Sequence, residues 1–311
     1  MSTIIAYGSR FNSHGGIIHA WSASAGINVT HHGSGCRLSH FNSRRGVMPN
    51  FVVLLIVALI VSAIGFKKYV WFISIGYGFS ICAIGLALII MFRRQMDAGL
   101  LVQCILFMVY GIRLGGYLAY RELKMASYNK KMVGEIKDGK TMSMIAKCGI
   151  WISAALLYAC ETSPVLFRLE SGKGTGTAVI IGIIISVAGL VIESLADIQK
   201  SRAKKVNPGR FVDTGLYRIV RCPNYFGEML FWTGVFVSGF GAVHGVWQWV
   251  AVLTGYLGII YVMFGGARRL EIRQNRSYGK DPEYQAYVKK TPIMIPLIPL
   301  YSVEKYKWLV A

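Results

Sequence analysis

Charged residues are scarce in this chain, and acidic residues are the scarcest of all. Asp, Glu, Lys and Arg make up only 15% of its 311 residues, whereas hydrophobic residues make up 54%. A water-soluble domain of this length would carry far more charge on its surface. The hydrophobic residues also gather in long blocks, as they do in segments that lie in lipid. These features argue against a soluble globule and predict a membrane protein.

The shortage of acidic residues leaves a strong positive balance. Only 14 Asp and Glu face 34 Lys and Arg, which gives a net charge of +20. In a soluble protein such a balance would suggest nucleic-acid binding. In a membrane protein, Lys and Arg gather in cytoplasmic loops instead, where they also meet anionic lipid headgroups. We therefore expect membrane lipids, and no nucleic acid, as partners.

Several familiar ligand signatures are missing. The six cysteines form no Cys-x-x-Cys pair, and no histidine lies at metal-ligand spacing from them. We therefore predict neither a disulfide nor a metal site. The glycine signatures of Rossmann and P-loop nucleotide sites are also absent. A nucleotide, if one binds, must bind in a helical membrane cavity.

Seven apolar segments approach the roughly 20 residues that a helix needs to cross a bilayer. They are Phe51–Phe66, Tyr69–Phe92, Gly99–Tyr120, Ser143–Cys160, Gly176–Leu195, Tyr225–Val243 and Val246–Gly266. The last two form a tight helical hairpin. We predict an all-α, polytopic membrane domain of about seven transmembrane helices over residues 48–311. Residues 1–47, which hold no Asp or Glu, predict a disordered tail, with a transit-type presequence as the alternative.

Loop charge predicts the orientation of these helices. With seven spans, one face receives Lys67 and Lys68, the loop 121–147, the loop 200–221 and the tail from Arg268, all of them basic. The positive-inside rule makes this face cytoplasmic. We expect the N-terminus outside and the C-terminus inside, in a bacterial cell membrane or, in a eukaryote, the endoplasmic reticulum.

Two carboxylates stand out in the fifth predicted span. Glu193 and Asp197 lie one turn apart on the same helix face. Ionisable groups in a span are costly, and two carboxylates repel unless a donor lies beside them. That donor is either a ligand, such as a ribose or an adenine amine, or a nearby Lys or Arg. The basic run 199–205 that follows suits solvent, lipid phosphate or a 2′-phosphate.

A polar loop leads into the sixth predicted span. Residues 207–228 hold two prolines and three glycines, which predict a folded loop with Pro223 at the start of a helix. Glu228 lies one turn inside that helix. A carboxylate there is costly without a partner. That partner is either a bound ligand or, in an ion pair that only fixes the loop, Arg218 or Arg221.

In the third predicted span, Tyr110 and Arg113 are i, i+3 neighbours. For Tyr110 the alternative to a functional role is packing against lipid. For Arg113 it is a side chain that extends to the membrane surface.

Several strings resemble the steroid 5-alpha-reductase C-terminal family, and above all its branch known as DUF1295. They are Ala196-Asp-Ile-Gln-Lys200, Gly215-Leu-Tyr-Arg218, Arg221-Cys-Pro-Asn-Tyr-Phe-Gly-Glu228, Tyr110-Gly-Ile-Arg113 with Arg121, and the tail Asp281–Pro296. The resemblance covers about residues 50–300. It implies a seven-helix fold with a cytoplasm-facing cavity for NADPH.

The resemblance also implies roles for single residues. Glu193 and Asp197 match positions at the adenosine, Asn224 and Glu228 match the nicotinamide end, and Arg113 and Arg121 match phosphate contacts. Tyr110, the predicted catalytic residue, matches the tyrosine that polarises a substrate ketone. The predicted cofactor-binding residues are Arg113, Arg121, Glu193, Asp197, Lys204, Tyr217, Arg218, Arg221, Asn224, Tyr225 and Glu228.

Two departures from the family pattern bear on function. Cys222 replaces the histidine that is usual in the bacterial branch. The catalytic glutamate that steroid reductases carry on the second helix has no counterpart, because Tyr69–Phe92 contains no Glu or Gln. The second catalytic acid is therefore unassigned.

The predicted function is NADPH-dependent reduction of a conjugated C=C bond in a hydrophobic small molecule drawn from the bilayer, such as a steroid, isoprenoid or lipid. One alternative is an S-adenosylmethionine-dependent methyltransferase similar to the isoprenylcysteine carboxyl methyltransferases. The other is a non-catalytic membrane scaffold.

Overall fold

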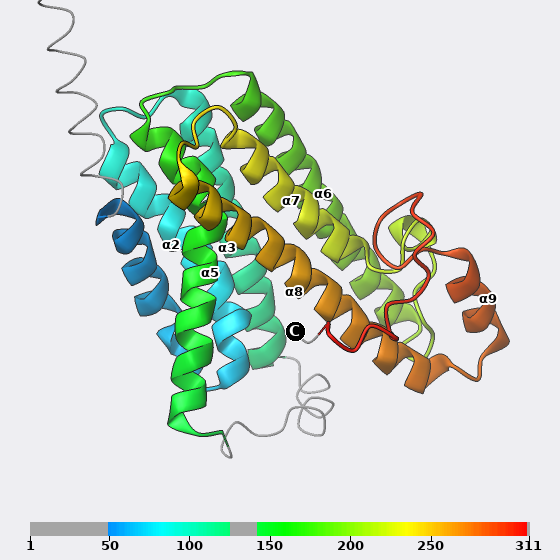
Figure 1. The fold of residues 1–311 in the computed structure, drawn as a ribbon. Coiled ribbons are helices and arrows are strands. Elements are labelled where there is room, and N and C mark those ends of the chain that lie inside the picture. Colours follow the sequence, from blue (N-terminus) through cyan, green and yellow to red (C-terminus); the bar gives the residue numbers. More distant parts are fainter. Residues whose placement is uncertain (1–48, 125–141, 310–311) are drawn as a thin grey trace, which may run out of the picture. The chain divides into compact units, whose positions relative to one another are not determined.

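The computed structural model describes residues 49–124 and 142–309, and every regular element among them is a helix (Figure 1). This confirms the predicted all-α class. The described elements belong to one unit, Val47–Ala311. The predicted tail, residues 1–47, and the central part of the predicted loop 121–147 lie outside the described residues.

The described elements are α-helices and short 3-10 helices. In chain order they are a helix over residues 49–62, η1 (Ala63–Phe66), η2 (Tyr69–Ile73), α2 (Ile75–Phe92), α3 (Ala98–Lys124), α5 (Met144–Glu170), α6 (Thr177–Val206), η4 (Gly215–Arg218), α7 (Pro223–Ser238), α8 (Val246–Tyr278) and α9 (Pro282–Lys290).

Six segments in the described part of the chain are long and apolar enough to cross a membrane. They are Pro49–Phe66, Tyr69–Phe92, Ala98–Arg121, Met144–Glu170, Thr177–Val206 and Val246–Tyr278. By length and composition the chain is thus an integral membrane protein. Six of the seven predicted spans correspond to these segments.

The remaining predicted span, Tyr225–Val243, corresponds to α7, which is shorter than expected. It has 16 residues, or about 24 Å at 1.5 Å per residue, against a hydrocarbon core of about 30 Å. The predicted hairpin with α8 is present, because α8 begins immediately after Gly245. The count of seven spans stays a prediction.

The predicted end of the fourth span at Cys160 is wrong, because α5 continues to Glu170. Pro164 lies inside this helix and cannot donate to the Cys160 carbonyl oxygen four residues earlier. The Ser163 hydroxyl donates to that oxygen instead, at 2.8 Å. Because the freed carbonyl finds a partner, the helix passes through the proline.

The predicted ends of the fifth and seventh spans were also too early. α6 continues from Leu195 to Val206, and α8 continues from Gly266 to Tyr278. Both extensions carry many charged residues. Hydropathy marks the part of a helix that suits lipid, and a helix that continues into water keeps its backbone hydrogen bonds without that apolar signal.

Glycines bring α6 and α7 into close contact. A Cβ on Gly189 would lie 2.4 Å from the Phe231 backbone nitrogen, and one on Gly234 would lie 2.3 Å from the Gly182 carbonyl oxygen. Small residues let helix backbones approach closely in membranes, where apolar burial drives helix association only weakly. This contact fixes α6 and α7 side by side along the part that carries Glu193 and Glu228.

The connections α2–α3, α5–α6 and α7–α8 lie together at one end of the bundle (Figure 1). Asp97 accepts a hydrogen bond from the Thr175 hydroxyl at 2.5 Å, and Lys173 donates to the Gly241 carbonyl oxygen at 2.5 Å. Arg168 donates to the Phe240 carbonyl oxygen at 3.0 Å. The three loops that the charge pattern assigned to one face of the membrane therefore share one end of the fold.

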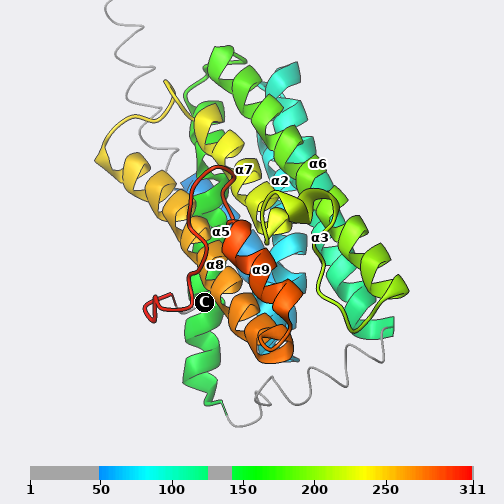
Figure 2. The same cartoon turned by 90° about the vertical axis from the view of Figure 1, so that its right-hand side faces the viewer.

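The C-terminal segment returns across α8 to the start of α7 (Figure 2). The Cys222 backbone N–H donates to the Ile293 carbonyl oxygen at 2.9 Å, and the Ile293 N–H donates to the Leu300 carbonyl oxygen at 2.8 Å. This segment covers the loop that leads into α7, at the end of the bundle where α6 and α8 extend furthest.

Candidate functional site

Five predicted site residues gather between α3, α6 and α7. They are Tyr110, Arg113, Glu193, Asp197 and Glu228. They come from three helices and from positions up to 118 residues apart in the chain. The structure thus brings the core of the predicted site together, although no single helix carries it.

Arg113 is the donor between the two carboxylates of α6. Its guanidinium forms an ion pair with Glu193, and its Nη1 lies 3.1 Å from Asp197 Oδ2. The sequence left open whether a ligand or a basic residue neutralises these carboxylates, and here an arginine does so. The interpretation of Arg113 as a side chain that only extends to the membrane surface is wrong.

Tyr110 is fully buried and hydrogen-bonded on the side of α7. Its hydroxyl donates to Glu228 Oε1 at 2.8 Å and lies 3.1 Å from the Tyr77 hydroxyl. Its ring stacks on Phe231, with centroids 4.3 Å apart. Packing of Tyr110 against lipid is therefore excluded.

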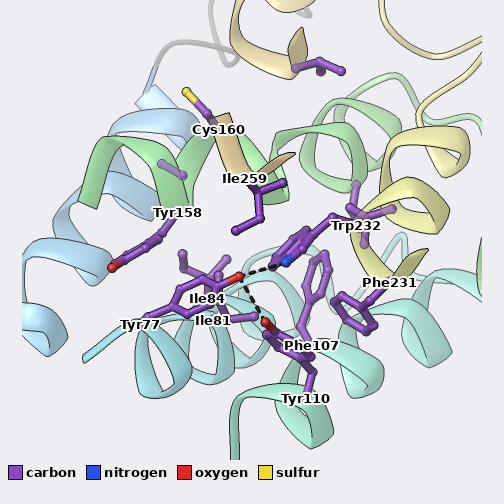
Figure 3. Close-up of a cluster of buried hydrophobic side chains, with 14 of the residues drawn as sticks. Tyr77, Ile81, Ile84, Phe107, Tyr110, Tyr158, Cys160, Phe231, Trp232 and Ile259 are labelled. Atoms are coloured by element: carbon purple, nitrogen blue, oxygen red, sulfur yellow. Dashed lines mark hydrogen bonds between the residues drawn. The ribbon is translucent and has the colours of Figure 1, made fainter. Parts of the chain in front are cut away.

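Tyr77 and Trp232 complete this polar contact deep in the bundle (Figure 3). The Trp232 indole N–H donates to the Tyr77 hydroxyl oxygen at 2.8 Å. Sequence reasoning missed both residues, because an aromatic residue in an apolar span carries no signal that separates a hydrogen-bonding role from packing.

The alternative in which Glu228 pairs with Arg218 or Arg221 is wrong. Glu228 contacts Tyr110, whereas Arg221 Nη2 lies 2.9 Å from Glu271 Oε1 and also donates to the Tyr301 carbonyl oxygen. Both members of the Arg221–Glu271 pair are at most 3% exposed. Arg221 therefore holds the C-terminal segment against α8 in this structure.

Lys204 and Tyr217 also fix loops. Lys204 Nζ donates to the Tyr278 hydroxyl at 2.9 Å and contacts the carbonyl oxygens of Pro208 and Arg210. The Tyr217 hydroxyl donates to the Ala196 carbonyl oxygen at 3.3 Å. Neither side chain lies in the cluster around Arg113.

The other predicted residues lie nearer the ends of the helices. Arg218 is exposed on η4, and the Arg121 guanidinium lies 5.8 Å from the Tyr117 ring centroid near the end of α3. Tyr225 lies against Gly266 of α8. Asn224, in the first turn of α7, has a buried Oδ1 with no hydrogen-bond partner among the described residues.

Cys222 is buried at the N-terminus of α7, at 1% exposure. Burial raises the pKa of its thiol to about 12, so the thiol is neutral and is no nucleophile at physiological pH. Among the described residues, no group of three or more His, Cys, Asp or Glu could hold a metal ion.

A pocket of about 360 Å³ opens beside the cluster, between α3 and α6. It is lined by Arg113, Tyr117, Ser194, Asp197, Ile198, Ser201, Arg202 and Lys205. Its volume is at the lower end of the range for small-molecule sites, about 300–1,000 Å³. Three cations and one carboxylate line it, which suits a ligand with both phosphates and sugar hydroxyls.

These residues fit the groups of NADPH. A carboxylate such as Asp197 accepts hydrogen bonds from ribose hydroxyls, and arginines accommodate a 2′-phosphate. The unpartnered Asn224 Oδ1 and Glu193 Oε2 are buried acceptors that an amide or hydroxyl donor could satisfy.

Comparison with known proteins identifies one matching family and one partial relative. Residues 59–291 match the family described as "Protein of unknown function (DUF1295)". Over 85 residues the chain is 32% identical to steroid 5-alpha-reductase DET2 of Arabidopsis thaliana, a match that covers 27% of this chain and 30% of the reductase. The chain thus spans less than a third of that relative. No solved structure matches.

Proposed function

This chain belongs to the DUF1295 family, and we propose that it is a membrane-embedded, NADPH-dependent reductase of a conjugated C=C bond in a hydrophobic substrate. One observation carries the proposal. Tyr110, Arg113, Glu193, Asp197 and Glu228 meet in a cluster that is buried at Tyr110, Glu193 and Glu228 and that opens at Arg113 and Asp197 into a cationic pocket. Partial similarity to a plant steroid reductase supports the same class.

In this proposal, Arg113, Asp197, Arg202 and Lys205 bind the phosphates and the ribose, because they line the pocket and have matching charge. Asn224 and Glu228 hold the nicotinamide end. When bound, NADPH supplies a hydride to the carbon β to a carbonyl group.

Tyr110 stabilises the charge that forms on the substrate oxygen. Its hydroxyl hydrogen now points to Glu228, and the proposal directs the same hydrogen to the carbonyl oxygen of the substrate. A donor that is already oriented in a dry site stabilises a developing oxyanion far better than one in water. Phe231 and Trp232 hold the Tyr110 ring and keep the site dry.

Thermal unfolding of the purified protein in detergent tests cofactor choice. A ligand that binds only the folded state raises Tm, by a stabilisation of about 2.7 kcal/mol at 100 times its Kd. We expect NADPH to raise Tm, NADH to raise it less, and S-adenosylmethionine to have no effect. A shift with S-adenosylmethionine alone would favour the methyltransferase, and no shift with any ligand would favour the scaffold.

Asp197→Asn provides the matched variant. It removes one carboxylate from the pocket and leaves the Arg113–Glu193 pair in place, so NADPH should stabilise it less than the wild type. Asp213→Asn is the control, because Asp213 pairs with Arg210 on a loop that does not line the pocket. An equal loss in both variants would contradict the assignment of Asp197.

A further inference from the structure

Glu161 is a buried acid outside the predicted site. It lies on α5 and is 3% exposed, and neither carboxyl oxygen has a hydrogen-bond partner among the described residues. A carboxylate without a donor in a membrane interior is costly. The neutral, protonated form is the one that such a position tolerates.

The side chain lies on the face of α5 that meets α2. Tyr158, one turn earlier, packs against Tyr77, with ring centroids 4.9 Å apart (Figure 3). Residues three apart lie on the same helix face, so Glu161 is directed to the same neighbour. Its carboxyl group is close enough to interact with the Tyr77 hydroxyl and with Glu228.

The backbone around Glu161 is held in place from the opposite side. A Cβ on Gly255 of α8 would lie 2.4 Å from the Glu161 backbone nitrogen. Backbones that approach so closely leave little room for α5 to shift. Glu161 therefore keeps its direction toward Tyr77.

The hydroxyl hydrogen of Tyr77 is not used by its contacts with Trp232 and Tyr110. A hydroxyl has one hydrogen, and an indole N–H can only donate. The Trp232 N–H donates to the Tyr77 oxygen at 2.8 Å. The Tyr110 hydroxyl is closer to Glu228, at 2.8 Å, than to Tyr77, at 3.1 Å, and donates its hydrogen to Glu228. The hydrogen of Tyr77 therefore remains for another acceptor, and its oxygen can take a proton from Glu161.

We propose that Glu161 and Tyr77 form the proton-donating pair of the reductase, with Glu161 as the second acid that the second helix does not supply. The inference rests on the proposed function. Tyr77 is the catalytic residue of this pair, because it gives a proton to the substrate, and Glu161 acts through it.

The step balances as a reduction of one C=C bond. The π bond breaks, the β carbon takes the hydride from NADPH, and the α carbon takes the proton of Tyr77. The O–H bond of Tyr77 breaks as that C–H bond forms, and the proton of Glu161 moves to the Tyr77 oxygen. Once the product has left, a proton from solvent returns to Glu161.

Infrared spectroscopy of the purified, ligand-free protein tests the pair without turnover. We expect a carboxylic-acid C=O band at neutral pH that disappears in Glu161→Gln and shifts in Tyr77→Phe, which removes the neighbouring hydroxyl. The control is Glu283→Gln, because the Glu283 carboxylate is exposed and forms an ion pair with Arg210. A spectrum of Glu161→Gln that keeps this band would overturn the proposal.

Kinetics with NADPH and a 3-keto-4-ene steroid then separate proton donation from structure. Loss of a general acid typically lowers the rate by about 10²–10⁴-fold. We expect such a fall in kcat for Glu161→Gln with unchanged NADPH affinity, a different pH profile, and partial recovery in Glu161→Asp. Wild-type kcat and pH profile in Glu161→Gln would overturn the inference. If the wild type reduces no enone, the proposed function fails, and the infrared bands still decide whether Tyr77 and Glu161 form an acid pair.

Discussion

Tyr110 shows how a single polar atom can be placed in a membrane interior. Its hydroxyl is fully buried and contacts Glu228 at 2.8 Å and Tyr77 at 3.1 Å. Water does not reach such a site, so every donor must find a partner within the protein. A hydroxyl held by both a carboxylate and a second tyrosine keeps one direction, as a preorganised donor must.

Tyr110→Phe should therefore lower turnover steeply and leave cofactor binding intact. Removing one preorganised donor to an oxyanion costs about 10²–10³ in kcat. Steady-state kinetics measure the first effect and the NADPH-induced rise in Tm the second. Tyr256→Phe is the control, because its hydroxyl contacts Thr233 at 3.1 Å on α7, in a contact that does not include Tyr110 or Glu228. Full activity in Tyr110→Phe would contradict the role of Tyr110.

At the scale of single residues, the sequence was informative where charge interrupts an apolar block. Glu193, Asp197 and Glu228 could be singled out in this way, and they lie in the cluster. The partners could not be predicted, because pairing depends on the distance between helices. Arg221, which looked equally functional, finds its partner Glu271 fifty residues later.

The contact between α6 and α7 positions the carboxylates of the cluster. Gly182, Gly189, Gly227 and Gly234 leave no space for a Cβ, because each would approach a backbone atom of the other helix within 2.6 Å. Each of these glycines is therefore required for close approach. Their role in this helix contact could not be predicted from the sequence, where they are only glycines within apolar spans.

Gly234→Ala should weaken this contact. Overpacking of a close-fitting interior typically costs about 1–3 kcal/mol, and the shift of α7 should also lower NADPH affinity because Glu228 moves with it. Thermal unfolding with and without NADPH measures both effects. The control is Gly149→Ala, where an added Cβ meets nothing within 4 Å. Equal stability of the two variants would contradict close packing at Gly234.

Asp97 couples two loops at the opposite end of the bundle. Partial burial raises its pKa, but hydrogen bonds from Thr175 and from the Leu100 N–H outweigh that effect and lower it. A carboxyl group whose pKa is lowered in the folded state stabilises the protein at pH values above its pKa in the unfolded chain, which is about 3.9. This stability is lost as the pH falls through the lowered pKa.

As the pH falls below about 4, the wild type should therefore lose more stability than Asp97→Asn. The asparagine of the variant has no charge to lose in this pH range. Tm measured against pH in detergent checks this difference. Parallel curves for the two proteins would show that the loop contact makes no pH-dependent contribution.

At the scale of helices, the starts were easier to predict than the ends. Ser143 caps α5 by accepting from the Ala146 N–H at 3.2 Å, close to the predicted start of that span. The ends failed because lipid-facing composition stops before the helix does. Glu161 was missed for this reason, since the predicted span ended one residue earlier, at Cys160.

For the whole molecule, loop charge predicts that the C-terminus is cytoplasmic and the N-terminus outside. A membrane-impermeant maleimide applied to intact cells should label Lys173→Cys, in the loop between α5 and α6. It should label Ser302→Cys, in the C-terminal segment, only after permeabilisation. Both residues are outside the helices, and the unsubstituted protein provides the background from its native cysteines. The reverse pattern would contradict a cytoplasmic C-terminus.

The class of the fold followed from composition alone, because few charges and long apolar blocks allow little else. The convergence of α2, α3, α6 and α7 on one polar cluster could not be predicted in this way, because hydropathy carries no information on the arrangement of helices in space. The pairing of Tyr77 with Trp232, 155 residues apart, illustrates this limit.

The central claim is hydride transfer by a membrane protein with this cluster, and isotope transfer tests it most directly. The purified protein would be incubated with NADPH deuterated at the transferable C4 position and a 3-keto-4-ene steroid, and the product analysed by mass spectrometry and NMR. We predict one deuterium at the carbon β to the carbonyl with the wild type, and a transfer rate lower by about 10²–10³-fold with Tyr110→Phe. Absence of deuterated product with the wild type, or equal transfer by Tyr110→Phe, would contradict the proposed reductase and the role of Tyr110 respectively.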